Sequence, residues 1–188
     1  MIFNNMNEEI NKNEIAIFAG GCFWCTEAIF KNLKGVINVL PGYTGGKRIY
    51  PTYEQVVTGA TGHAESIKIT FNPEKISYEE LLEIFFSTHD PTTLNRQGND
   101  VGTQYRSAVF YTSEKQKKLA EAYINFLEKE DVFDKYIVTE ILPATEFYIA
   151  EKYHHNYLEN HPENPYCQFV IVPKLEKFKK YYQNKLKK

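Results

Sequence analysis

The chain has 188 residues, a formal net charge of −2, 43% hydrophobic residues and 24% charged residues. This composition is typical of a soluble globular protein and excludes a mainly disordered chain, so we expect one domain over residues 1–188. The small net charge argues against a general nucleic-acid-binding protein, and no apolar run is long enough to span a bilayer. Residues 1–13 lack the basic and apolar regions of a signal peptide, and predict a flexible tail on a cytoplasmic protein.

Hydrophobic spacing and turn residues divide the chain into strands and helices. Alternating or short apolar runs predict strands at residues 14–19, 36–40, 64–71, 106–111 and 137–142. Helical spacing predicts helices at residues 22–33, 113–129 and 147–158, a short helical turn at 53–57, and a helix that begins after Ser77. Ser77 and Glu80 have the spacing of a capping box, in which each side chain accepts a hydrogen bond from the other residue's backbone N–H.

A long loop and a basic end complete the chain. Residues 89–104 form a polar loop of a length that is typical of functional segments. Residues 173–188 hold seven lysines and one glutamate but also an apolar stripe, so we expect a solvated helix with one packed face rather than a membrane or RNA tail. The stripe consists of Leu175, Phe178, Tyr182 and Leu186.

The order of the predicted elements indicates the fold class. It predicts an α+β fold, with a split βαβ (ferredoxin-like) α/β sandwich core, additional helices and a long C-terminal segment. A short-loop α/β fold is the alternative.

Three cysteines, Cys22, Cys25 and Cys167, are too few for a disulfide scaffold and favour catalysis, redox chemistry or metal binding. Cys22 follows a strand and two glycines and opens a helix, where free N–H groups and the helix dipole are expected to stabilise a thiolate. The Cys22-x-x-Cys25 pair has the spacing for a disulfide or for half of a zinc site. Only Cys167 remains as a third thiolate ligand, so a metal site is poorly supported.

Glu65 and several tyrosines are candidates for proton transfer. Glu65 begins a strand, and among aromatic side chains its pKa would rise until it could donate a proton near neutral pH. Tyr43, Tyr53 and Tyr105 lie in or beside glycine-rich loops, where phenols can donate hydrogen bonds to a substrate oxygen.

Several longer motifs carry a family resemblance. They are GGCFWCTE at residues 20–27, GYTGG at 42–46, GHAE at 62–65, HDPTT at 89–93, RQGNDVGTQYRS at 96–107 and YHHNYL at 153–158. With these motifs in this order, over about residues 14–177, the chain resembles the peptide methionine sulfoxide reductase A family. The resemblance implies an α+β sandwich around a split βαβ core. We expect residues 14–160 to form the catalytic core and 161–188 a C-terminal segment that carries Cys167.

The resemblance also implies an activity and its partners. The expected reaction is reduction of the S epimer of methionine sulfoxide, free or in proteins, with electrons from thioredoxin. No metal and no organic cofactor is expected. We expect no nucleic-acid or membrane partner, and a monomer.

Roles follow from positions within the motifs. Cys22 matches the nucleophile, and Glu65 matches the acid. The other matches are Phe23 and Trp24 for the apolar wall that holds the substrate methyl, Tyr53 and Tyr105 for the phenols that bind the sulfoxide oxygen, and Asp100 for a polar residue of the same site. Tyr43 and His63 are also expected to contact substrate. A thiolate attacks a sulfoxide sulfur only if the oxygen is protonated or strongly hydrogen-bonded, which explains why this set is needed.

The reaction would leave a sulfenic acid on Cys22. A second thiol would then condense with this sulfenic acid to form a disulfide. Many family members have glycine at the position of Cys25 and use cysteines near the C-terminus. Cys167, on a proline-flanked segment of the matching tail, is therefore favoured, with Cys25 as the alternative. Two other functions remain open: a general thiol–disulfide oxidoreductase that uses Cys22-x-x-Cys25, and a zinc-stabilised binding module.

Overall fold

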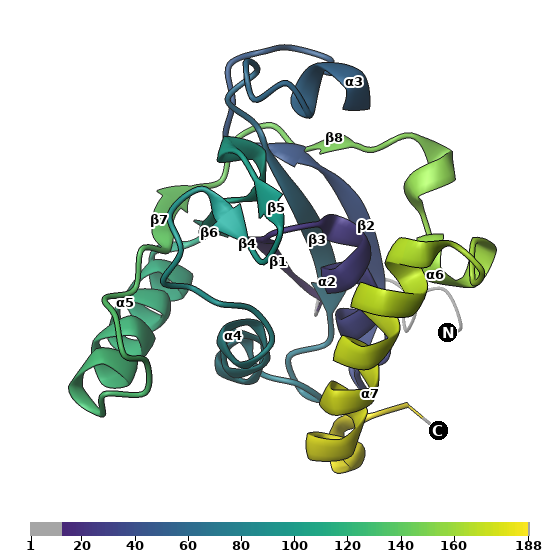
Figure 1. Cartoon of the computed structure of the whole chain (residues 1–188). Coiled ribbons are helices and arrows are strands. Elements are labelled where there is room, and N and C mark those ends of the chain that lie inside the picture. The colour runs from purple at the N-terminus through teal and green to yellow at the C-terminus, as the bar shows by residue number, and fades with distance from the viewer. Residues whose placement is uncertain (1–12, 188) are drawn as a thin grey trace, which may run out of the picture.

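A six-stranded sheet runs through the centre of the computed structural model, which describes residues 13–187 (Figure 1). The strands lie in the order β7-β6-β1-β3-β2-β8. The predicted tail, residues 1–13, falls outside the described residues apart from its last position. The bounds of the strands are β1 (Glu14–Gly20), β2 (Val36–Thr44), β3 (Ala64–Phe71), β6 (Ser107–Tyr111), β7 (Glu140–Pro143) and β8 (Tyr148–Ile149).

The four central strands form two interlocked split βαβ units. β1 and β2 both run antiparallel to β3, which lies between them, and helix α2 (Phe23–Phe30) connects them. β3 and β6 likewise flank β1, and helix α4 (Tyr78–Ser87) lies between them in the chain. This strand order is the ferredoxin-like arrangement, so the predicted α+β fold is confirmed. Two further helices, α5 (Glu114–Lys129) beside α4 and α7 (Val172–Tyr181) beside α2, extend the helical layer (Figure 1).

Alternation along β1 divides the core between the two faces of the sheet. Phe18 turns to the face covered by α2 and α4, and stacks on Phe85 with ring centroids 4.8 Å apart. Ile17 turns to the other face and belongs to a second cluster with Phe110, against which Phe147 packs. Both faces of β1 are therefore buried, which fixes the position of the turn that leads from β1 into α2.

The start of α4 follows its predicted capping box. Ser77 Oγ accepts a hydrogen bond from Glu80 N at 3.1 Å, and Glu80 Oε2 accepts one from Ser77 N at 2.8 Å. These two bonds satisfy N–H groups that have no partner within the helix.

The long polar loop, residues 89–104, contains a small hairpin. β4 (Arg96–Gln97) pairs antiparallel with β5 (Asp100–Val101), and Gly98 between them has a φ of +59°. A 3₁₀ turn, Thr103–Tyr105, leads from the hairpin into β6.

The prediction of a helix at residues 147–158 is wrong. β8 pairs instead with Gly42 and Tyr43 at the edge of β2, and a 3₁₀ turn (Lys152–His154) and a short helix α6 (Tyr157–Asn160) follow. The free backbone groups at the edge of β2 bond the segment as a strand. Asn156 then has a φ of +52°, which interrupts any helix that would continue through it.

The apolar stripe of the C-terminal segment packs as expected. Leu175 and Phe178 are buried on α7, which follows a π-helical turn (Cys167–Ile171). Leu186 forms an isolated bridge with Leu33 next to the end of α2. No helix within residues 13–187 combines the length and the apolar character that a membrane span requires.

Candidate active site

Cys22 lies where β1 turns into α2. Its backbone carbonyl accepts a hydrogen bond from Cys25 N at 3.1 Å, and Cys22 is the N-cap residue of α2. The preceding Gly21 has a φ of +89°, and a Cβ there would lie 2.6 Å from Cβ of Gln97 in the β4–β5 hairpin. Glycine is therefore required for the turn to approach the hairpin this closely. Cys22 itself is only 8% exposed.

Glu65 reaches the same helix start from β3. Its Oε2 accepts a hydrogen bond from the Phe23 N–H at 3.1 Å, and the residue is 2% exposed. Burial raises the pKa of this carboxyl to about 8, because the loss of water outweighs the single backbone bond that favours the anion. Glu65 therefore carries a proton at neutral pH, which is what a proton donor needs.

The expected stabilisation of a Cys22 thiolate is wrong for the resting site. Burial raises the pKa of the Cys22 thiol well above its ordinary value, and the neighbouring Cys25 thiol and Glu65 carboxyl raise it further. The free N–H groups of the helix start do not offset this loss of water. The site therefore holds a neutral thiol beside a neutral carboxyl.

Tyr53 and Tyr105 lie near Glu65 and near each other. Tyr53 begins the short helix α3 (Tyr53–Val56), and Tyr105 ends the 3₁₀ turn before β6. Burial raises the pKa of both phenols, and the Glu65 carboxyl adds to the effect. Both therefore remain hydrogen-bond donors. Gln104 joins their two segments, because its Nε2 donates to the carbonyl of Val57 at 3.0 Å.

An aromatic cluster surrounds the first turn of α2. Phe23 is 1% exposed and stacks on Tyr53 with ring centroids 6.5 Å apart. Trp24 stacks face to face on Tyr157, with ring centroids 3.7 Å apart and planes 6° apart. The Trp24 Nε1–H donates to Nδ1 of His154 at 3.0 Å. These rings form an apolar wall beside Cys22.

His154 and Tyr157 were not among the predicted site residues, although both belong to the YHHNYL motif. His154 is fully buried, and within residues 13–187 its Nε2 has no hydrogen-bond partner. Burial lowers the pKa of the ring to about 4, so His154 stays neutral and accepts the Trp24 hydrogen bond. The motif itself was the available signal, but most of it fell in the helix predicted at residues 147–158, which does not form.

Tyr43 and His63, expected to contact substrate, have other partners. Tyr43 is 1% exposed and donates its hydroxyl to Oε2 of Glu151 at 2.7 Å. His63 is also 1% exposed, and its ring nitrogens bond the N–H of Gly46 at 3.1 Å and the carbonyl of Arg48 at 2.7 Å. These contacts support a structural role for both side chains.

A cavity of about 400 Å³ reaches the Cys22 and Cys25 thiols. Glu65, Tyr53 and Tyr105 do not line it. Its lining residues are Gly20, Cys22, Cys25, Gln97, Gly98, Asn99, Asp100, Tyr166, Val170 and Lys174.

Tyr166 connects the two sides of this cavity. Its hydroxyl donates to Oδ2 of Asp100 at 2.8 Å and lies 4.0 Å from Sγ of Cys25. The sequence patterns did not single out Tyr166. The only signal was that it directly precedes Cys167 in the C-terminal segment.

The two candidate resolving thiols have different surroundings. The Cys25 thiol interacts with that of Cys22, and this contact, helped by the charge of Lys174, lowers the pKa of Cys25 in spite of burial. Cys167 is fully buried in a cluster that includes Cys22, Cys25 and Ile171, and burial raises its pKa. All three cysteines are free thiols. In the described part of the chain, no group of three or more His, Cys, Asp or Glu side chains is placed to hold a metal ion.

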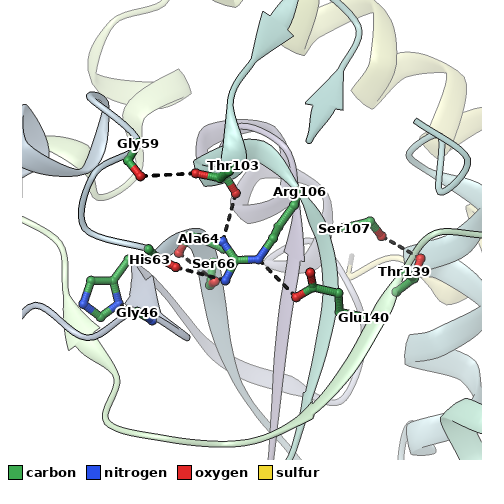
Figure 2. Close-up of polar contacts among 11 residues, drawn as sticks. Gly46, Gly59, His63, Ala64, Ser66, Thr103, Arg106, Ser107, Thr139 and Glu140 are labelled. Atoms are coloured by element: carbon green, nitrogen blue, oxygen red, sulfur yellow. Dashed lines mark hydrogen bonds and ion pairs between the residues drawn. The ribbon is translucent and has the colours of Figure 1, made fainter. Parts of the chain in front are cut away.

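Arg106 ties together the segments that carry Glu65 and Tyr105 (Figure 2). Its guanidinium donates to the carbonyls of Thr103 at 2.9 Å and Gly62 at 3.1 Å. It also forms an ion pair at 3.2 Å with the carboxylate of Glu140 in β7. Thr103 begins the turn that ends at Tyr105, and Gly62 directly precedes the strand of Glu65. One buried side chain therefore holds the phenol and the acid at a fixed separation.

These groups together suit one kind of chemistry. A thiol, a protonated carboxyl and two phenols gather around the start of α2, beside an aromatic wall. Such a set can attack an oxidised sulfur while the oxygen on that sulfur receives a proton and hydrogen bonds.

Comparisons with known proteins agree with this chemistry. A family model described as peptide methionine sulfoxide reductase matches residues 14–186. The peptide methionine sulfoxide reductase MsrA of Sulfolobus acidocaldarius is 57% identical, over 92% of this chain and 97% of its own length. The reduced form of Mxr1 from Saccharomyces cerevisiae has a TM-score of 0.74 at 36% identity, covering 84% of this chain and 90% of that chain. Mxr1 in complex with Trx2 has a TM-score of 0.53 at 27% identity, covering 78% and 86%. The chain belongs to the peptide methionine sulfoxide reductase family.

Proposed function

We propose that the protein reduces the S epimer of methionine sulfoxide, free or within proteins, with Cys22 as the nucleophile and Glu65 as the acid. The observation that carries this proposal is the 3.1 Å hydrogen bond from the Phe23 N–H to Glu65. Since Phe23 directly follows Cys22, the bond brings a protonated carboxyl to the helix start that holds the thiol.

In the first step, an oxygen atom passes from the substrate sulfur to Cys22. Glu65 gives its proton to the sulfoxide oxygen as Cys22 attacks the sulfur and forms an S–S bond, and the proton of the Cys22 thiol restores the acid. The S–O bond of the substrate then breaks, the oxygen bonds to the Cys22 sulfur as a hydroxyl group, and the transient S–S bond breaks to release the thioether. Tyr53 and Tyr105 donate hydrogen bonds to the oxygen while negative charge develops on it. The sulfoxide is reduced to a thioether and the thiol is oxidised to sulfenic acid, so the step is balanced.

Phe23 and Trp24 are proposed to hold the substrate methyl group, because aromatic rings bind thioether carbon and sulfur favourably. With an apolar wall on one side and an acid on the other, the sulfoxide oxygen can point in only one productive direction. We therefore expect the S epimer to be reduced and the R epimer to remain. The test is methionine release from each separated epimer with a dithiol reductant. Equal rates for the two epimers would contradict this placement of the aromatic wall and the acid.

For the second step, the surroundings of the thiols support Cys25 as the resolving residue. The family resemblance of the C-terminal segment had favoured Cys167 instead. The Cys22 and Cys25 thiols interact and line the same cavity, and the pKa of Cys25 is lowered. Cys167 does not line that cavity and is enclosed in its π-helical turn. A Cys22–Cys25 disulfide would form without unwinding the tail.

We expect Cys25→Ser to stop after one turnover and Cys167→Ser to continue, because Cys25 interacts with Cys22 and shares its cavity, which Cys167 does not line. Methionine formed per enzyme with a thioredoxin system as reductant measures this difference, and mass spectrometry identifies the disulfide. The opposite pattern, with Cys167→Ser stalled and Cys25→Ser active, would assign the step to Cys167.

We propose thioredoxin as the electron donor. A relative of this fold, Mxr1, has been solved in complex with Trx2, which supports the same partner for this chain. A Cys22–Cys25 disulfide would line the cavity, where the thiolate of an external dithiol can attack it.

A further inference from the structure

The disulfide-forming step needs a proton at a second place. When the Cys25 sulfur bonds to the sulfenic acid of Cys22, the S–O bond breaks and the oxygen leaves as hydroxide unless it is protonated. Glu65 accepts the Phe23 N–H hydrogen bond and does not line the cavity that the two thiols share. A donor that lines the cavity beside the two thiols is therefore better placed to supply this proton.

Tyr166 lies at this point. Its hydroxyl lies 4.0 Å from Sγ of Cys25, and Tyr166 lines the cavity that Cys22 and Cys25 share. The same hydroxyl donates to Oδ2 of Asp100 at 2.8 Å, and the ring contacts Trp24 edge-on with centroids 5.8 Å apart. These contacts hold the phenol beside the Cys25 thiol, in the cavity that Cys22 also lines. Burial raises the pKa of the phenol, which keeps it protonated.

We propose that Tyr166 is a catalytic residue of the disulfide-forming step, in which it protonates the oxygen that leaves Cys22. This inference rests on the proposed function, in which Cys22 becomes a sulfenic acid and Cys25 resolves it. Asp100 accepts the phenol hydrogen bond in the resting site and so orients the hydroxyl.

The step is balanced without an outside reagent. A bond forms between the sulfurs of Cys22 and Cys25, and the S–O bond on Cys22 breaks. The phenol proton of Tyr166 goes to the oxygen, which leaves as water, and the phenol oxygen takes the thiol proton of Cys25. The Cys22 sulfur is reduced and the Cys25 sulfur is oxidised by the same amount.

The test is Tyr166→Phe in the full chain with Cys167→Ser, so that only Cys25 can form the disulfide. The reduced protein is mixed with methionine S-sulfoxide in the absence of a reductant. Methionine release reports the first step, and trapping of sulfenic acid with mass spectrometry reports the second. We expect unchanged methionine release, accumulation of sulfenic acid and disulfide formation about 100-fold slower, the size of a general-acid effect.

Tyr182→Phe in the same background is the matched control. Tyr182 also lies in the C-terminal segment, and its hydroxyl donates to Oγ of Ser87 at 2.9 Å. Its loss should leave both steps unchanged. A small buffer acid should accelerate disulfide formation in Tyr166→Phe but not in its parent, because an acid from solution then replaces the phenol.

The possible results distinguish failure of the Tyr166 proposal from failure of the proposed function. Disulfide formation at the parent rate in Tyr166→Phe overturns the proposal. Equal slowing of both steps without rescue by the buffer acid also overturns it, because the phenol would then only hold the tail in place. If the parent releases methionine but forms no Cys22–Cys25 disulfide, the inference fails and the reductase function stands. If the parent releases no methionine, the proposed function fails as well.

Discussion

Replacing Cys22 by Ser is expected to reduce methionine sulfoxide turnover to the rate without enzyme. A serine hydroxyl is a poor nucleophile toward sulfur and cannot take up the oxygen as a sulfenic acid. Serine is a favourable N-cap residue, so α2 should keep its start and the variant should fold. Methionine release with a dithiol reductant measures the loss, and circular dichroism checks the fold.

Cys167→Ser provides the matched control, because it removes another buried thiol from the same cluster. We expect this variant to release methionine at the rate of the unmodified protein. Measurable turnover in Cys22→Ser would mean that another residue attacks the sulfoxide.

Glu65→Gln is expected to slow the first reduction by a factor of about 10²–10⁴, the range for loss of a positioned acid. Glutamine has the same shape and its side-chain oxygen can accept the Phe23 N–H, but it has no proton to donate. The measurement is the rate of methionine release in a single turnover. Glu79→Gln, an exposed substitution in the first turn of α4, should leave that rate unchanged.

The pH dependence tests the same role. The active form of Glu65 is the protonated acid, and burial raises the pKa of its carboxyl to about 8. The single-turnover rate should therefore fall as the pH rises through about 8, and this fall should vanish in Glu65→Gln. A general thiol–disulfide oxidoreductase would not need Glu65. An undiminished rate in Glu65→Gln would accordingly favour that function over the proposed one.

The parts of the fold that could be predicted are those set by local sequence. The capping box of Ser77 and Glu80 begins α4 because its two hydrogen bonds join residues three apart. The alternation at residues 64–71 identifies β3 because each side chain is assigned to a face by its position alone. The motifs likewise placed Cys22 and Glu65 together, and the structure brings them to one helix start.

The parts that could not be predicted depend on distant contacts. Residues 147–158 show helical spacing, but the open edge of β2, more than a hundred residues earlier, pairs with them as β8. The charge state of Cys22 depends on how deeply the whole fold buries it, which the position at a helix start does not reveal. Tyr166 reaches Asp100 across 66 residues of chain, so no local pattern marks their contact.

Trp24 is the single tryptophan of the chain, and it stacks on Tyr157 and contacts Tyr166 edge-on. The protein thus contains one indole, located beside the thiols and packed against the C-terminal segment, and its emission is separable from that of the 14 tyrosines. Any movement of the tail away from α2 exposes the indole to water and shifts its emission. Any movement of this segment during turnover can therefore be followed optically in unlabelled protein, in real time.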